Sequence, residues 1–197
     1  SVDGTYSCDG IAGLTSLTAT SIFTQEILLD SGWSLWSTYI DPEDDNIATI
    51  FSTIVDDVIM AKDGEGNVYW PQFGLNSIGD LAQASGYQVK MDNQNTLSVS
   101  GALIPSSYGF NLNNGWGIIG YLHQDCFNVD DMMNSIIDNL IIMKDAEGNV
   151  YWPEFDLNSI GNMCPGNGYR IKTNESVDFS YPSGGRFGFS DFTTVGK

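Results

Sequence analysis

The amino-acid sequence predicts a mainly β protein with one short helix per repeat (α+β), built as two tandem homologous modules plus extended terminal segments. An 18-residue stretch occurs twice, at 62–79 and 144–161, so that 144 minus 62 gives an offset of 82. Fifteen of these 18 positions are identical, and the exceptions are Gly64/Ala146, Gln72/Glu154 and Gly74/Asp156. Short alternating runs and one apolar stripe at helical spacing accompany each copy. Such self-similarity indicates a duplicated structural module.

The repeat sets the domain boundaries. We expect an N-terminal extended arm at 1–26, repeat 1 at 27–105, repeat 2 at 106–182 and a C-terminal strand or tail at 183–197. A module of about 80 residues buries only about 60% of its unfolded surface and is marginally stable alone. We therefore expect the modules to pack on each other or on neighbouring chains.

Each module is predicted to contain, in order, a strand, a helix, a hairpin, a loop and a second hairpin. A turn and a strand begin at Gly32-Trp33 and again at Gly115-Trp116. The helix is indicated by apolar residues at i, i+3, i+4, i+7, i+8 and i+11. These are Ile47, Ile50, Phe51, Ile54, Val55 and Val58 in repeat 1, and Val129, Met132, Met133, Ile136, Ile137 and Leu140 in repeat 2.

Residue types indicate where these elements begin and end. Asn46 and Asn128 precede the two helices, where an amide oxygen can cap a free backbone N–H. The apolar runs 58–62 and 140–144 predict buried strands. Gly66 and Gly148 are expected to have positive φ in the hairpin turns that follow.

The charge excludes several classes of partner. Seven basic residues face 25 acidic ones, for a net charge of −18, which disfavours binding to nucleic acid and to anionic lipid. No apolar run reaches the length of about 18 residues that membrane insertion requires. The chain begins at Ser1 without a Met, which we interpret as removal of a leader. The expected localisation is therefore secreted, at the extracellular cell surface.

The cysteines are unevenly shared between the repeats. Cys126 and Cys164 both fall in repeat 2, and repeat 1 has neither. Two thiols gained together predict a disulfide between them, with a pair of buried free thiols as the alternative. Cys8 has no evident partner in the chain, so it is either buried or paired with another molecule.

No catalytic constellation is recognisable, and we predict that the protein is not an enzyme. The single histidine, His123, is expected to be structural. Nucleophile-elbow, Walker, Rossmann and zinc-protease motifs are absent from the sequence. Carboxylate pairs could serve glycoside hydrolysis, but an acid-rich surface always offers such pairs.

Calcium is the one cofactor that the residue pattern suggests. Asp41, Glu43, Asp44 and Asp45 form a cluster of hard oxygen ligands in one loop of repeat 1. Residues 63, 65 and 67 also have the 1, 3, 5 spacing that begins a calcium loop, although a tight hairpin turn explains the same residues.

Aromatic and basic residues recur at matched positions. Tyr69-Trp70 and Tyr151-Trp152 alternate on a hairpin strand, so one ring of each pair should point outward. That ring is a candidate for binding a glycan, or for burial between modules or subunits. Four lysines also match between the repeats, and we expect each of them to pair with a carboxylate: Lys62, Lys90, Lys144 and Lys172.

The ordered set of motifs resembles a tandem module of secreted, multi-domain surface proteins of Bacteroidetes-type marine bacteria, which often carry type IX secretion sorting domains. It covers about residues 27–182. The resemblance implies extracellular location and modular architecture, since its motifs consist of turn and core residues. They are Gly32-Trp33, Lys62-Asp63, Gly66-Asn67, Asn76-Ser77-Ile78-Gly79 and Gly86-Tyr87, with partners 82 or 83 residues later.

These observations together predict a secreted structural or adhesive cell-surface protein that self-associates, as a filament subunit through strand exchange by its terminal segments. Phe187, Phe189 and Phe192 are the candidate assembly residues, because leaving such rings in water forgoes about 1.5–3 kcal/mol each. The partners would be further copies or other surface proteins. The alternative is an extracellular carbohydrate- or calcium-dependent binding module.

Overall fold

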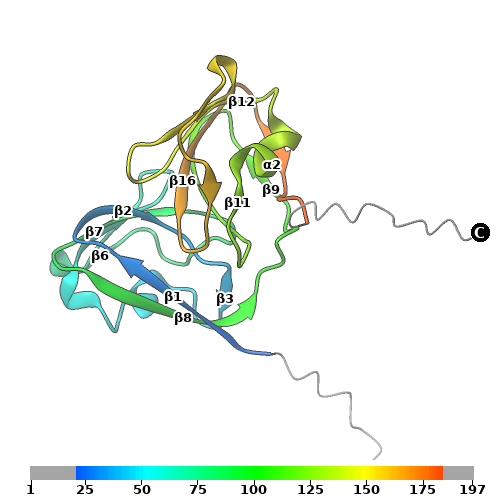
Figure 1. Cartoon of the computed structure of the whole chain (residues 1–197). Coiled ribbons are helices and arrows are strands. Elements are labelled where there is room, and N and C mark those ends of the chain that lie inside the picture. The colour runs from blue at the N-terminus through cyan, green and yellow to red at the C-terminus, as the bar shows by residue number, and fades with distance from the viewer. Residues whose placement is uncertain (1–20, 184–197) are drawn as a thin grey trace, which may run out of the picture.

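The computed structural model describes residues 21–183, which form two similar β-rich modules stacked against each other (Figure 1). This confirms the predicted fold class, with one short α-helix in each module. Module 1 contains β1 (Phe23–Leu29), β2 (Gly32–Trp36), β3 (Ile40–Pro42), α1 (Ile47–Ile50), β4 (Val58–Lys62), β5 (Val68–Trp70), β6 (Leu75–Asn76), β7 (Tyr87–Met91) and β8 (Asn95–Leu103). Module 2 contains β9 (Phe110–Leu112), β10 (Gly115–Gly120), β11 (Phe127–Asn128), α2 (Val129–Met133), β12 (Leu140–Lys144), β13 (Val150–Trp152), β14 (Leu157–Asn158), β15 (Asn162–Met163), β16 (Gly168–Thr173) and β17 (Val177–Phe179).

Each module has one five-stranded antiparallel sheet, and the strand order is the same in both. It is β2-β7-β4-β5-β6 in module 1 and β10-β16-β12-β13-β14 in module 2. Even the irregularity is repeated, since the register shifts between Val58 and Met60 and again between Leu140 and Ile142. The duplication seen in the sequence is therefore a duplication of structure.

The second sheet differs between the modules. Module 1 has a three-stranded sheet in the order β1-β8-β3, whereas module 2 pairs only β17 with β9 and adds a small β11–β15 ladder. Strand β1 begins at Phe23, so residues 23–26 of the predicted arm pair with β8 of module 1. Residues 1–20 and 184–197, with Cys8 and the three candidate assembly phenylalanines, lie outside the described residues.

The helices are shorter than their apolar stripes suggest. Helix α1 ends at Ile50, and the rest of the stripe continues through turns and a 3₁₀ segment at Val55–Asp57. β-Branched residues dominate the stripe, and they lower helix propensity by restricting χ1. The predicted caps are present, since the Asn46 side chain accepts from Ala48 N at 3.1 Å and that of Asn128 from Asp130 N at 2.8 Å.

Two separate hydrophobic cores hold the modules. In module 1 the ring of Trp36 packs on Phe51 and Tyr87, with centroids 5.3 and 5.5 Å apart. In module 2 the core is centred on Tyr121 and Tyr181, which meet edge-on at 5.4 Å. The core of module 2 also includes Ala84 and Ile104 of module 1, so part of the contact between the modules is apolar.

Another part of the contact is made by backbone groups and is nearly two-fold symmetric. Trp36 pairs with Asn167, and Ser85 pairs with Ile119. These bridges are equivalent, because adding 83 to 36 gives 119 and adding 82 to 85 gives 167. The same symmetry relates two hydrogen bonds, from Ser37 N to Gly166 O at 3.0 Å and from Gly120 N to Ala84 O at 2.7 Å.

Glycines make this close approach possible. A Cβ on Gly86 would lie 2.5 Å from the carbonyl oxygen of Ile119, one on Gly120 2.7 Å from that of Ser85, and one on Gly168 2.8 Å from that of Trp36. The Ser37 hydroxyl completes the junction by donating to Asn167 O at 2.6 Å and accepting from Tyr121 N at 3.0 Å.

The hairpin glycines behave as predicted. Gly66 has φ of 97° and Gly148 has φ of 91°, both in the region that favours glycine. The non-identical pair Gly64/Ala146 also has a structural reason. A Cβ on Gly64 would lie 3.1 Å from the backbone nitrogen of Ile118, so this turn of module 1 packs tightly on β10 of module 2.

Adding one methyl group at the junction should have a large effect on the stability of the protein. Gly86→Ala should lower the free energy of unfolding by about 1–3 kcal/mol, since the new Cβ has to displace backbone of the other module. Urea unfolding followed by tryptophan fluorescence measures it. Gly109→Ala is the matched control, because no atom lies within 4 Å of its added Cβ. Equal stability of both variants would show that the modules do not depend on this contact.

Candidate functional site

Each module presents an exposed tryptophan beside two lysines. Lys62 and Lys90 place their Nζ atoms 5.5 and 5.9 Å from the Trp33 ring centroid. Lys144 and Lys172 lie 5.7 and 5.9 Å from Trp116 in the same way. The tryptophans nevertheless remain 46% and 52% exposed. We call these two groups the Trp–Lys clusters.

Strand alternation positions these side chains. Trp33 of β2 is the direct cross-strand partner of Lys90 of β7, while the neighbouring residues Val89 and Met91 point into the core. Trp116 and Lys172 pair identically between β10 and β16. The outer face of each five-stranded sheet therefore carries one cluster. From the sequence we expected each lysine to pair with a carboxylate. The structure instead places each lysine beside a tryptophan ring.

The two outer faces meet at the junction. Arg170 donates from Nη2 to Oε1 of Gln88 at 3.2 Å, and the two residues are repeat equivalents on β16 and β7. The contact forms because both strands begin beside the glycine junction. All lysines and arginines among residues 21–183 therefore lie on these two faces: Lys62, Lys90, Lys144, Arg170 and Lys172.

A cavity of about 340 Å³ adjoins the cluster of module 2. It is lined by Trp116, Lys144 and Arg170 from module 2 and by Asp63 and Gly64 from the hairpin turn of module 1. Because the walls come from both modules, this cavity exists only when the junction is formed. It combines an aromatic surface with two cations.

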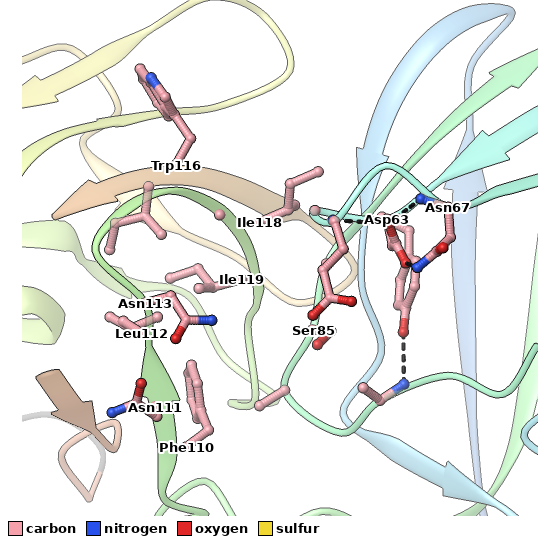
Figure 2. A pocket seen from close by; sticks show the side chains of 18 of the residues that line it. Asp63, Asn67, Ser85, Phe110, Asn111, Leu112, Asn113, Trp116, Ile118 and Ile119 are labelled. Carbon is pink, nitrogen blue, oxygen red and sulfur yellow. Dashed lines mark hydrogen bonds between the residues drawn. The ribbon is translucent and has the colours of Figure 1, made fainter. Parts of the chain in front are cut away.

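A second cavity, of about 330 Å³, lies between the modules and is shown in Figure 2. The segment from β9 to β10 forms one wall with Phe110, Asn111, Asn113 and Trp116, and the turn at 63–67 with the segment at 78–87 forms the other. Trp116 and the Gly64–Ile118 contact are shared by both cavities. Trp116 therefore lies at the border of both of these cavities.

Asp63 is already committed to its own turn. Its Oδ1 accepts from the backbone N–H groups of Glu65, Gly66 and Asn67 at 2.8–2.9 Å, and its Oδ2 accepts from Asn67 Nδ2 at 2.6 Å. Asp145 receives the equivalent bonds from Asn149. The 1, 3, 5 spacing therefore builds the hairpin turn, which was the alternative to a calcium loop.

Two of the other acidic candidates accept hydrogen bonds from backbone N–H groups. Asp44 accepts from Asn46 N at 3.1 Å, and the Asp45 carbonyl accepts from Leu81 N at 2.8 Å. Asp41 pairs with Ala102 through β3 and β8, and Glu43 is exposed in the same loop. Within 21–183, no group of three or more His, Cys, Asp or Glu side chains is arranged to hold a metal ion.

The aromatic residues of the two hairpins point to opposite sides of their strands, as the alternation of side chains predicts. Tyr69 and Tyr151 are buried in the cores, and Trp70 and Trp152 lie on the other side of their strands. Phe73 and Phe155 cover these tryptophans edge-on at 4.6 Å, and both indole N–H groups are buried without a partner. The more exposed rings are Trp33 and Trp116, which the sequence reasoning placed on strands but not in a site.

Cys126 and Cys164 form the predicted disulfide, with Cα atoms 4.2 Å apart. It joins the residue before β11 to the residue after β15, and these strands pair with each other. The bridge therefore reinforces a ladder of two residue pairs, where module 1 has the single equivalent pair Asn46 and Asp80.

Removing this disulfide should cost module 2 stability. With a sequence separation of 38, the chain-entropy model gives about 4 kcal/mol for the double variant Cys126→Ala/Cys164→Ala. Urea unfolding of the variant and the oxidised protein measures the difference. Identical midpoints, or two free thiols found by peptide mapping without reductant, would contradict the bridge.

His123 is buried in module 2, with 6% of its surface exposed and no partner for Nε2. It contacts Phe127 edge-on at 5.0 Å. Burial lowers its pKa below the usual 6.5, although the Pro182 carbonyl and Asp125 oppose the shift. Neutral His123 is a structural residue, and its counterpart in module 1, at 123 minus 83, is Ile40.

This burial predicts a pH dependence of stability. Because the pKa of His123 is lower in the folded protein, the unfolded chain takes up its proton first as the pH falls below 6.5. The free energy of unfolding should therefore decrease more between pH 7 and 5 in the natural protein than in His123→Ile. Urea titrations at both pH values test this, since the carboxylates titrate alike in both proteins. Parallel pH profiles would contradict it.

Buried phenols form a second repeated feature. Tyr87 Oη accepts from Ala82 N at 2.7 Å, and Tyr169 Oη accepts from Cys164 N at 2.9 Å. Burial raises the pKa of Tyr87 to about 12, so this phenol stays neutral and holds the loop before β7. Tyr87 and Tyr169 therefore serve the fold.

Among residues 21–183, module 2 has no strand that corresponds to β3 of module 1, and we call that place beside β17 the vacant strand position. Strand β8 runs for 9 residues between β1 and β3, but its counterpart β17 has 3 residues and pairs with β9 alone. Within the described part, residues 123–125, which match β3, form no strand. A cavity of about 330 Å³ adjoins these residues, and its walls include Leu122, His123 and Phe127 of module 2 and Tyr39, Leu103 and Ile104 of module 1.

Comparison with known protein families, characterised proteins and solved structures gives no match for this chain. No helix among the described residues has the length and apolar character to cross a membrane. The site therefore has to be interpreted from its own residues: two Trp–Lys clusters, the cavities at the junction, and the vacant strand position of module 2.

Proposed function

We propose that the protein is a secreted structural or adhesive cell-surface protein that self-associates, one copy completing the second sheet of the next. The observation that supports this most is the vacant strand position of module 2. The five-stranded sheets of the two modules have the same strand order, so the shorter second sheet of module 2 is a specific difference. The disulfide supports the extracellular location, since such bonds persist in oxidising compartments.

Module 1 shows what the position normally holds. Its β8 pairs with all seven residues of β1 and then with the three residues of β3. Ile40 of β3 is buried in the core. A strand supplied to module 2 would therefore gain both ladder hydrogen bonds and burial of alternate side chains.

The continuation of the same chain is poorly suited to this position. By the offset of 82, Pro182 stands where module 1 has Ser100, and proline has no N–H for the ladder. Gly184 and Gly185 would match Ala102 and Leu103, so the natural register brings no apolar side chain. The position is better served by another segment.

We assign it to residues 1–20 of a second copy. The stretch 14–20 has the alternating, Thr-rich pattern typical of strands, and it leads directly into edge strand β1. The donor segment precedes module 1 and the acceptor lies in module 2, so the contact is head-to-tail. Head-to-tail contacts extend into filaments unless the rotation closes a ring.

Exposed apolar side chains support association as well. Ile22, Phe23 and Leu28 lie exposed on or beside β1, the strand from which the donor segment extends. The net charge of −18 opposes assembly, but salt screens exposed charges beyond about 8 Å at physiological ionic strength.

Deletion of residues 1–20 tests the proposal. In calcium-containing salt buffer at high protein concentration, the full chain should form particles of several copies, and the truncated chain should be a monomer by light scattering. A synthetic peptide of residues 1–20 should bind the truncated chain and block assembly of the full one. The matched peptide carries Leu14→Asp and Leu17→Asp and should do neither.

A second deletion separates the two ends of the chain. Removal of 184–197, with Phe187, Phe189 and Phe192, should leave assembly intact if residues 1–20 are the donor. Assembly that survives loss of 1–20 but not loss of 184–197 would overturn the assignment of the donor. A full-length monomer under all these conditions would overturn self-association itself.

A further inference from the structure

We propose that the outer faces of the two five-stranded sheets bind an anionic polysaccharide whose sugars carry carboxylate or sulfate groups. The surface runs from the Trp–Lys cluster of module 1, across the Gln88–Arg170 contact, to the cluster of module 2. This binding site is independent of self-association, because none of its residues lines the vacant strand position.

The placement of positive charge is the first observation. All five cations among residues 21–183 lie on these faces, in a chain where acidic residues outnumber basic ones by 25 to 7. A solubilising surface would intersperse both signs. Concentrating the scarce cations on one surface creates a local region that attracts anions despite the net charge.

The position of the two tryptophans is the second observation. Trp33 lies on β2 and Trp116 lies on β10, and each of these is an edge strand of its five-stranded sheet. The lysines therefore approach each tryptophan from one side. About half of each side chain therefore remains open to solvent. An exposed aromatic face can stack on the apolar face of a sugar ring, while the adjacent ammonium groups pair with its acidic substituent.

The cross-strand register sets the order of these side chains along the surface. In module 1, Trp33 and Lys90 form one row, and Gln88 and Lys62 form the next row toward the junction. Module 2 repeats this order in reverse from the junction, with Arg170 and Lys144 and then Lys172 and Trp116. A linear chain crossing the junction would meet the two clusters in turn.

The cavity beside Arg170 marks the stronger half. Its 340 Å³ hollow is lined by Trp116, Lys144 and Arg170, whereas module 1 has the neutral Gln88 in place of Arg170. Module 2 thus offers three cations to an acidic sugar and module 1 offers two. This inequality provides an internal control.

A polysaccharide fits better than a nucleic acid. Binding of a nucleic acid depends on many phosphate contacts, and a surface with five cations in a strongly acidic protein supplies few. A polyuronate or sulfated glycan carries less charge per unit length and exposes apolar ring faces for stacking.

Binding can be measured with the full chain at concentrations where it is monomeric. Polygalacturonate and dextran sulfate should quench tryptophan fluorescence and bind at low salt, and raising the salt should weaken both. Neutral dextran and single-stranded DNA should bind at least tenfold more weakly. The first two probes distinguish a preference for carboxylate from one for sulfate.

Paired variants locate the site. Lys144→Gln/Lys172→Gln should reduce affinity about tenfold, and Trp116→Ala by at least as much. The matched variant Lys62→Gln/Lys90→Gln in module 1 should have a smaller effect. Tyr108→Ala, which changes an exposed ring in the segment between β8 and β9, should have none. Unchanged melting temperatures would confirm that the variants fold.

Several results would overturn the proposal: no binding of either acidic polymer at low salt, equal binding of neutral dextran, preference for DNA, or variants that bind like the natural protein. Light scattering of the same samples reports self-association separately. Failure of one proposal is therefore distinguishable from failure of the other.

Discussion

The structure depends on a backbone-to-backbone contact between two copies of one module. Gly86, Gly120 and Gly168 let main chains approach so closely that a methyl group could not be inserted at any of the three. This contact aligns the two five-stranded sheets end to end and brings Arg170 to Gln88. It also creates both cavities beside Trp116. Without it, the molecule would be two marginal domains with separate surfaces.

Several differences between the repeats fall at contacts that only one of the two modules makes. Gly64, not Ala146, packs on the backbone of the other module. Arg170 replaces Gln88 beside the larger cationic cavity. Pro182 replaces Ser100, and β17 stops where β8 continues. In a tandem repeat, identity preserves the shared fold, so the departures are the places where a specific function is most reasonably sought.

Much of the fold could be predicted from the sequence, because turns, caps and alternation are local properties. Gly66, Asn46 and the Cys126–Cys164 pair all behave as their residue types suggested. The helix was predicted too long, since periodicity reports the buried face and not the hydrogen bonding. The Trp33 cluster could not be found locally, because its lysines are adjacent only through cross-strand register. The signal was present as matched tryptophans and lysines, but register is a tertiary property.

Charge ties the two proposed activities together through opposite responses to salt. Association of copies with a net charge of −18 is opposed by mutual repulsion, so added salt favours it. Binding of an acidic polysaccharide to lysines and Arg170 is an attraction over short distances, so added salt weakens it. Dilution of the surrounding salt would release copies from one another while strengthening their hold on the glycan. A protein that used both surfaces would thus exchange self-association for adhesion as ionic strength falls.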